Sequence, residues 1–421
     1  MRVYFTNLGC KLNQAEVDSL ARHFVAAGHR LAPQLEDADL HIINSCTVTH
    51  LAARDSRKIA RRGHRSNPEL KTVLTGCYAS AEPEEATDLS GVDLVVTNDR
   101  KHRLLELVHE AFPEARPEPF EGVPVPYVPL DFGHARALVK IEDGCNMKCS
   151  FCIIPYTRGR QRSRALDEVV AEVQALGGGG YSEVVVTGVQ ISEYRDDDGH
   201  RLYDLVAALL ERTDVPRLRL TSIAPWKFDD RLLDLWTDRR LCRHIHMSLQ
   251  SGSTATLRRM RRPYTADQYA ALAGKLRSAI PGLALTTDVI VGFPGETDQE
   301  FAESLAFVER MAFARPHIFT YSQREGTHAD TLPDQVPHAV KKERVQAMLE
   351  VAGASDRAFR QGQLGQTLDV VWEDTRDGQW RGLSDNYIRV QADAPARRLV
   401  PGMLAPAQLT ELHGAGVMAS L

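Results

Sequence analysis

The chain has 421 residues, of which 43% are hydrophobic and 25% are charged, a composition typical of a globular protein with two or three domains. No run approaches the roughly 20 apolar residues that cross a bilayer, and the first residues lack the order of a signal peptide, so we expect a cytoplasmic protein without a membrane anchor. The net charge of -5 argues against binding of nucleic acid through overall positive charge, so any RNA contact would depend on local basic patches.

The first segment, residues 1–111, alternates short apolar runs with helical patterns. The runs RVYFTNLG, LHIINS, TVLTG and DLVVTN predict strands, and a helix is expected around Ala15 to Ala27. This alternation is typical of a doubly wound sheet of parallel strands. The proline-rich stretch 112–130 cannot continue a helix or a central strand, so we expect a domain linker there.

Two further domains are predicted after the linker. Residues 131–360 carry six apolar runs, each followed by a loop and a helical pattern: ALVKIE, SEVVVTG, RLRLTSI, HIHMSLQ, LTTDVIVGF and RPHIFTYS. Six such units predict a partial (β/α) barrel. Residues 361–421 change to short alternating segments, which predict a small antiparallel β barrel. The expected fold class is therefore α/β, with a small β barrel at the C-terminus.

Three cysteines, Cys145, Cys149 and Cys152, lie within eight residues directly after the first strand of the predicted barrel. A cube of four irons and four sulfides needs one ligand per iron, so three thiolates leave one iron open. An open iron can bind the amino and carboxylate groups of S-adenosylmethionine (SAM), whose reductive cleavage yields a 5′-deoxyadenosyl radical. A structural zinc site would need a fourth ligand, and no cysteine or histidine follows at the usual spacing. We therefore predict a catalytic [4Fe–4S] cluster here.

Three other cysteines, Cys10, Cys46 and Cys77, each stand just beyond an apolar strand run. The carboxyl ends of parallel strands share one edge of a sheet, so these residues can meet there. A single cysteine after a strand is more often a small core residue. Three equivalent positions favour a second cluster with three thiolates and one open iron. The seventh cysteine, Cys242, precedes a strand, and we expect it to be structural.

The motifs TNLGCKLNQAEVD, NSCTVTHLAARDSRKIARR, TGCYA and CIIPYTRGRQRSR resemble the methylthiotransferase family of radical SAM enzymes over the whole chain. The resemblance is closest to the branch that acts on N6-threonylcarbamoyladenosine (t6A) in tRNA. It implies methylthiolation of carbon 2 of t6A at position 37 of the anticodon loop, with two [4Fe–4S] clusters and with SAM as methyl donor and radical source. It also implies an RNA-binding TRAM module at 361–421 and a reducing electron donor such as flavodoxin or ferredoxin. We expect a monomer.

Glycines and polar residues gather at the ends of later barrel strands, in TGVQ, SLQSGS and TDVIVGFPGE. That end of a (β/α) barrel is where cofactors are held, although turns and caps need the same residue types. The resemblance favours six residues as lining the SAM pocket: Gly188, Gln190, Gln250, Ser251, Asp288 and Gly292.

Basic residues form three runs, at 54–65, 158–164 and 258–262. Each run by itself is more often a solvated helix face than an RNA site. The residues that we predict to contact RNA come from the first run and from the C-terminal module: Arg61, Arg62, Arg65 and Arg389.

Three alternatives remain for the function. The first is a methylthiotransferase for isopentenyladenosine in tRNA, and the second is one for a ribosomal protein. The third is a non-catalytic, metal-stabilised RNA-binding protein, which would need closed four-ligand sites. The two three-cysteine sets argue against closed sites.

Overall fold

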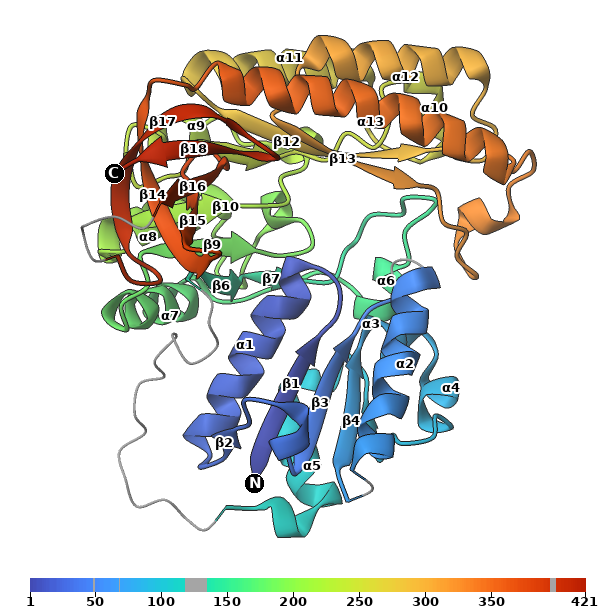
Figure 1. Cartoon of the computed structure of the whole chain (residues 1–421). Coiled ribbons are helices and arrows are strands. Elements are labelled where there is room, and N and C mark those ends of the chain that lie inside the picture. The colour runs from blue at the N-terminus through green and yellow to red at the C-terminus, as the bar shows by residue number, and fades with distance from the viewer. Residues whose placement is uncertain (48–49, 68, 118–134, 394–398) are drawn as a thin grey trace. The chain divides into compact units, whose positions relative to one another are not determined.

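The computed structural model describes residues 1–47, 50–67, 69–117, 135–393 and 399–421 (Figure 1). Most of the predicted linker at 112–130 lies outside these residues. The chain forms two compact units, of which the first contains the N-terminal residues together with 143–147 and 152–162. The second unit contains the rest of the chain up to Leu421. No helix in the described ranges is long and apolar enough to cross a membrane.

The first unit contains a parallel sheet of five strands in the order β2-β1-β3-β4-β5 (Figure 1). The strands are β1 (Arg2–Asn7), β2 (Arg30–Leu31), β3 (Leu40–Ser45), β4 (Lys71–Gly76) and β5 (Leu94–Val96). The helices are α1 (Lys11–Ala26), α2 (His50–Ser66), α3 (Cys77–Ala81), α4 (Pro83–Thr87) and α5 (Leu104–Ala111). All four predicted strands are present, and the doubly wound sheet is confirmed.

Helices cover both faces of this sheet. On one face, Phe24 of α1 and Val108 of α5 join the core cluster that contains Ile42 of β3. On the other face, Ala60 of α2 joins the cluster that contains Ile43. Side chains alternate along a strand, so these neighbouring isoleucines point to opposite layers, and both are fully buried.

The second unit begins with six parallel strands in two sheets, β6-β9-β10 and β11-β12-β13. Isolated parallel bridges between Leu218 and Leu241 and between Ile223 and Met247 link the two sheets, which together form the predicted partial barrel. The strands are β6 (Ala137–Lys140), β9 (Glu183–Thr187), β10 (Arg217–Leu220), β11 (His244–His246), β12 (Ala284–Val291) and β13 (Arg315–Thr320).

The helices of this unit follow the strands in chain order. They are α7 (Leu166–Gly178), α8 (Leu202–Arg212), α9 (Leu232–Leu235), α10 (Thr254–Arg259), α11 (Ala266–Ala279), α12 (Asp298–Met311) and α13 (His338–Gln361). The segment of the second cysteine triplet carries the short helix α6 (Ile154–Arg158) and the two-residue strands β7 (Glu142–Asp143) and β8 (Arg162–Ser163).

The C-terminal residues close into a five-stranded barrel in the order β14-β15-β16-β18-β17. The strands are β14 (Thr367–Arg376), β15 (Gln379–Ser384), β16 (Arg389–Asp393), β17 (Leu404–His413) and β18 (Gly416–Ser420). Trp372, Val390 and Leu409 lie in its core. Four neighbouring pairs are antiparallel, as predicted, whereas β16 and β18 pair in parallel.

A buried arginine joins this small barrel to the (β/α) core within the second unit. Arg219 of β10 pairs with Glu183 of β9 at 2.7 Å and donates to the carbonyl oxygens of Ser384 at 3.0 Å and Asp385 at 2.9 Å. Burial opposes ionisation of Glu183, but Arg217, Arg219 and a third arginine hold the pKa of this carboxyl well below its usual range. The ion pair is therefore maintained in the dry interface.

Candidate functional site

The first cysteine set lies at the carboxyl edge of the N-terminal sheet. Cys10 follows β1 and precedes α1, Cys46 follows β3, and Cys77 follows β4 and begins α3. In the strand register, Ser45 pairs with Gly76, so Cys46 and Cys77 are the next residues of neighbouring strands. The predicted convergence on one edge is therefore seen for these loops.

Two glycines allow the cysteine loops to approach each other. Gly9 has a φ of +104° and Gly76 a φ of +99°, a region that side chains other than glycine rarely adopt. A Cβ atom on Gly9 would lie 2.8 Å from the Cys46 sulfur, and one on Gly76 would collide with the Ser45 carbonyl oxygen. The loop that carries Cys10 thus packs directly against Cys46.

The surroundings of these sulfur atoms fit an iron–sulfur cluster. Cys46 and Cys77 are buried, whereas Cys10 is exposed. The side-chain amide of Asn98 donates to the Cys77 sulfur at 3.9 Å, and hydrogen bonds to ligand sulfurs tune such clusters. The three thiols can supply three of the four ligands that a [4Fe–4S] cube needs, which leaves one iron open.

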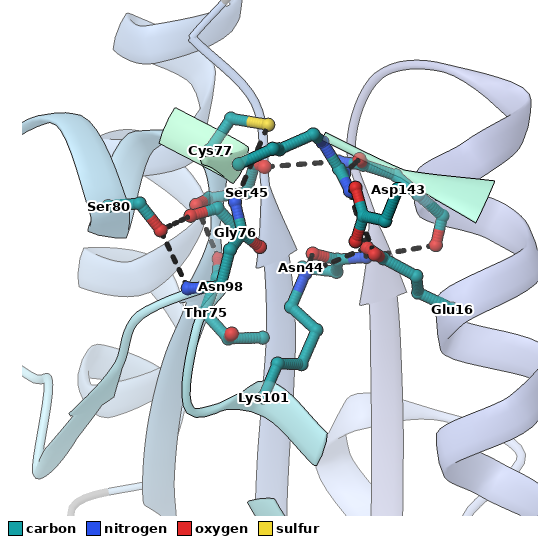
Figure 2. A network of polar contacts seen from close by, with 12 residues as sticks. Glu16, Asn44, Ser45, Thr75, Gly76, Cys77, Ser80, Asn98, Lys101 and Asp143 are labelled. Atoms are coloured by element: carbon teal, nitrogen blue, oxygen red, sulfur yellow. Dashed lines mark hydrogen bonds and ion pairs between the residues drawn. The ribbon is translucent and has the colours of Figure 1, made fainter. Parts of the chain in front are cut away.

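A buried polar network lies beside this edge (Figure 2). The Lys101 ammonium donates to Glu16 at 2.7 Å and to Asn44 at 3.0 Å. The Arg158 guanidinium pairs with Glu16 at 2.9 Å and with Asp143 at 2.8 Å. All five residues are buried, so the two cations and two carboxylates compensate each other away from water.

Electrostatics link this network to Cys77. Burial lowers the pKa of Lys101, against the opposing effect of Glu16. Burial acts in the same direction on Arg158, but Glu16, Cys77 and Asp143 outweigh it and raise the pKa of the guanidinium well above its usual value. Arg158 therefore stays charged beside Cys77. Its predicted place in a basic surface run is wrong, because the structure buries it in this network.

The second cysteine set lies in the segment after β6, and all three residues are half-buried. Cys145 and Cys152 belong to segments of the first unit and Cys149 to the second. The Cys145 amide donates to the Gly159 carbonyl at 3.1 Å, and its sulfur accepts from the Met147 amide at 3.4 Å. Backbone contacts thus fix the Cys145 turn.

Cys149 accepts a hydrogen bond from a guanidinium within the second unit. Arg262 Nη1 lies 3.3 Å from the Cys149 sulfur, and its guanidinium lies 4.5 Å from the centre of the Trp226 ring. Arg259, from the same predicted basic run, pairs with Glu300. Both arginines therefore have internal partners, which the sequence pattern did not indicate.

Gly188 and Gln190, predicted to line the SAM pocket, surround a buried carboxylate. The backbone N–H of Gln190 donates to the Glu142 carboxylate, and a Cβ atom on Gly188 would lie 2.7 Å from Glu142 Cγ. Glu142 lies two residues beyond β6, at the start of β7, and was not singled out in the sequence. Its carboxylate fixes the shape of the loop after β9.

The other predicted pocket residues differ in accessibility. Gln250 has a φ of +71°, and its backbone N–H donates to the backbone carbonyl oxygen of Asp288. Ser251 is fully buried, with its hydroxyl accepting from the Ser253 amide. Gly292 is also buried, and a Cβ atom there would collide with Lys341 of α13. Gln250 and Asp288 are the partly exposed members of this group.

Asp288 lies between two histidines that the sequence motifs did not indicate. Its carboxylate lies 3.2 Å from His246 Nε2 and 3.4 Å from His317 Nδ1, and the three ligand atoms lie within 4.8 Å of one another. Burial opposes ionisation, but both histidines hold the pKa of Asp288 well below its usual range. The opposite face of β12 carries Leu285 and Val289 of the core. The cluster therefore lies on the face of the sheet opposite this core, and all three residues are partly exposed.

The predicted RNA-contacting residues lie on two elements. Arg61, Arg62 and Arg65 lie on α2 and are exposed, whereas Ala53 and Ala60 of the same helix are buried. Arg389 of β16 is half-exposed and pairs with Glu373 at 2.6 Å. The α2 arginines thus form a basic face, while Arg389 has an acidic partner.

Two family models match the chain. The Radical SAM superfamily matches residues 139–308, and the Uncharacterized protein family UPF0004 matches residues 2–97. In solved structures, the fold is similar to that of the radical SAM methyltransferase TsrM from Kitasatospora setae, with a TM-score of 0.60 at 16% identity over 78% of this chain and 77% of that chain. The cobalamin-dependent radical enzyme OxsB is similar with a TM-score of 0.54 at 14% identity over 85% of this chain and 56% of that one.

Curated relatives extend the match over most of the chain. The threonylcarbamoyladenosine tRNA methylthiotransferases MtaB of Bacillus subtilis (strain 168) and Aquifex aeolicus (strain VF5) are 36% identical, over 92% and 93% of this chain and 89% and 97% of their own. The tRNA-2-methylthio-N(6)-dimethylallyladenosine synthase of Anoxybacillus flavithermus is 34% identical over 88% of this chain and 73% of its own.

A cysteine triplet after the first strand of a (β/α) barrel, within a matching superfamily model, defines a radical SAM protein. Such proteins use SAM together with a [4Fe–4S] cluster. The identity over both domains is more specific: the chain belongs to the methylthiotransferase family of radical SAM enzymes.

Proposed function

We propose that this protein methylthiolates carbon 2 of t6A at position 37 of tRNA, using two [4Fe–4S] clusters. Relatives at 36% identity are named as t6A methylthiotransferases, and relatives at 34% identity are named for dimethylallyladenosine. Identity alone therefore separates the two substrates weakly. The residues of the site must therefore indicate whether the adenine carries the polar threonylcarbamoyl group or the apolar dimethylallyl group.

The cluster of Asp288, His246 and His317 supports the polar group. Threonylcarbamoyl carries a carboxylate, a hydroxyl and a urea group, all of which need hydrogen-bonding partners when they leave water. A dimethylallyl group has none of these and would gain no hydrogen bond from the cluster. Ser248 adds a hydroxyl 3.5 Å from the Asp288 carboxylate. The partly exposed polar cluster on β11 to β13 is the observation that carries the t6A assignment.

The residues around the second triplet fit the radical-forming cluster. SAM bound at an open iron supplies the 5′-deoxyadenosyl radical and, in a second molecule, the methyl group. Arg262 donates a hydrogen bond to the Cys149 sulfur, and hydrogen bonds to ligand sulfurs tune such clusters. Glu142 fixes the Gln190 backbone at the strand end where a barrel enzyme holds its cofactor. An external one-electron reductant such as flavodoxin or ferredoxin completes the proposed reaction.

Nucleoside mass spectrometry tests the substrate. Reduced, reconstituted enzyme is incubated with SAM, a sulfide source and tRNA that carries t6A, and we expect 2-methylthio-t6A and 5′-deoxyadenosine. Cys149→Ala should abolish both products. tRNA that carries dimethylallyladenosine or unmodified adenosine serves as the matched control. Equal turnover of these tRNAs would reject t6A as the substrate and leave the radical chemistry intact.

A further inference from the structure

Arg158 is contributed by the radical SAM sequence but lies in the N-terminal unit. It follows Cys152 in the chain and falls within the Radical SAM match at 139–308. Its ion-pair partner Glu16 falls within the N-terminal match at 2–97. Residues 152–162 nevertheless pack into the first unit, together with the N-terminal sheet. The two family segments therefore share one buried network.

Arg158 orients the side chain that joins two of the cysteine loops. Its Nη2 atom donates to the Asn13 side-chain oxygen at 2.6 Å. The Asn13 amide nitrogen in turn donates to the carbonyl oxygens of Leu8 at 2.7 Å and Ser45 at 3.0 Å. These carbonyls belong to the segments that lead into Cys10 and Cys46. The guanidinium thus fixes which way the Asn13 amide points.

Helix α6, which ends at Arg158, also contacts the loop of the third cysteine, Cys77. Asn98 donates to the Thr157 carbonyl oxygen at 2.8 Å and to the Cys77 sulfur at 3.9 Å with the same nitrogen. The segment that contains Arg158 is therefore connected to all three cysteine loops by hydrogen bonds.

Charge balance requires the arginine as well. Arg158 pairs with both Glu16 and Asp143, whereas Lys101 pairs with Glu16. Removal of the guanidinium therefore takes a cation from two buried carboxylates, which is strongly destabilising. An iron–sulfur cluster bound by three thiolates would bring further negative charge to the same edge.

We propose that Arg158 is a positioning residue of the N-terminal cysteine site: it holds the loops of Cys10, Cys46 and Cys77 in place for an anionic iron–sulfur cluster. The identity of that ligand rests on the proposed second cluster. The positioning itself is a property of the protein without iron, and the two can be tested separately.

Cysteine alkylation in the cluster-free, full-length protein tests the positioning, because the chain contains two matched pairs of buried arginine and buried cysteine. Arg158 interacts with Cys77 in the first unit, and Arg219 interacts with Cys242 in the second. We expect Arg158→Gln to loosen the loop of Cys77 and to make its buried sulfur more accessible. Modification of Cys77 by N-ethylmaleimide should then be at least tenfold faster, while the rate at Cys242 stays unchanged. Mass spectrometry measures both rates. Arg219→Gln should produce the opposite pattern.

Unchanged reactivity of Cys77 in Arg158→Gln, or equal acceleration at Cys77 and Cys242, would overturn the proposal. Arg158→Lys keeps the charge but cannot form the forked hydrogen bonds, so it should give an intermediate rate. Asn98→Ala, which retains every ion pair, should also accelerate Cys77 alone if a charge variant fails to fold.

Iron binding then tests the ligand. In a background of Cys145→Ala, Cys149→Ala and Cys152→Ala, we expect about four irons per chain, and Arg158→Gln should lower that number at least twofold. Full iron occupancy in Arg158→Gln would overturn the proposal. Absence of iron in the background protein would refute the second cluster, while the alkylation pattern would still report on positioning.

Discussion

A single carboxylate sets the space that is available at the loop after β9. Glu142 is buried, accepts the Gln190 amide and leaves no room for a side chain at Gly188. Overpacking of this kind costs about 1–3 kcal/mol. We therefore expect Gly188→Ala to displace the Gln190 loop and to raise the Kd for SAM about tenfold, measured by equilibrium dialysis on the reconstituted protein.

Gly178 provides the matched control for this substitution. It lies at the end of α7, and no atom would lie within 4 Å of an added Cβ. Gly178→Ala should leave the Kd for SAM unchanged. Equal Kd values in both variants would contradict a role of the Gly188 loop in SAM binding.

His41 predicts an acid sensitivity of the N-terminal sheet. Burial lowers the pKa of this fully buried histidine from 6.5 to about 4, and its ring shares a hydrogen bond with Thr6 at 2.8 Å. Between these pH values the unfolded chain binds a proton that the folded chain does not. The stabilisation is therefore complete above pH 6.5 and falls as the pH approaches 4, by on the order of 3 kcal/mol.

Hydrogen exchange measures this decrease locally. In the cluster-free protein, amides of β3 should exchange faster at about pH 4.5 than at about pH 7 after correction for the intrinsic rate. His41→Asn removes one titrating ring and should reduce this difference, while His29, whose pKa burial also lowers to about 4, keeps its contribution. A wild-type sheet with equal protection at both pH values would show that His41 is accessible to protons in the folded state.

The local pattern of apolar residues was sufficient to predict most strands. All six apolar runs of the (β/α) domain are strands, because a buried parallel strand needs a continuous apolar segment. The two-residue β2 has no such segment, and its pairing depends on β1. β18 follows β17 closely in the chain. Its parallel pairing with β16 depends on barrel closure, which no short window of sequence contains.

The basic face of α2 predicts a contribution to RNA binding. Arg61, Arg62 and Arg65 lie on its outer side, and each phosphate that an arginine neutralises releases counterions from RNA. Replacement of all three with glutamine should weaken tRNA binding. The slope of log K against log salt should decrease by about 0.7–0.9 for each phosphate that is no longer neutralised, measured by filter binding.

An equal change of charge elsewhere serves as the control for α2. Arg310, Lys342 and Arg357 lie on the outer sides of α12 and α13. Their replacement with glutamine should leave the salt slope close to that of the wild type. A slope that changes equally in both triple variants would reflect overall charge and would reduce α2 to a solvated helix face.

The site was predictable only where residues are close in sequence or share an obvious strand position. Both cysteine sets met one of these conditions. Arg158 did not, because its partner Glu16 lies 142 residues away, and sequence alone cannot distinguish a surface arginine from one that will be buried beside a distant carboxylate. His246 and His317 join Asp288 from separate strands. The alternation in HIH and in RPHIF was the available signal for them.

The number of clusters is the prediction that concerns the whole chain. Two sets of three cysteines each leave one iron of a [4Fe–4S] cube without a protein thiolate, so anaerobic reconstitution should give about eight irons per chain. Elemental analysis should detect iron and little zinc, because closed tetrahedral sites would need a fourth protein ligand.

Removal of each cysteine set separates the two clusters. Replacement of Cys10, Cys46 and Cys77 with alanine should leave about four irons and preserve 5′-deoxyadenosine formation, because the radical depends on the second set. Replacement of the second set should also leave about four irons but abolish 5′-deoxyadenosine. Disappearance of all iron, or unchanged iron, in the first variant would contradict two independent clusters. Neither variant should form methylthiolated tRNA, because the proposed reaction needs a radical from one cluster and sulfur held at the other.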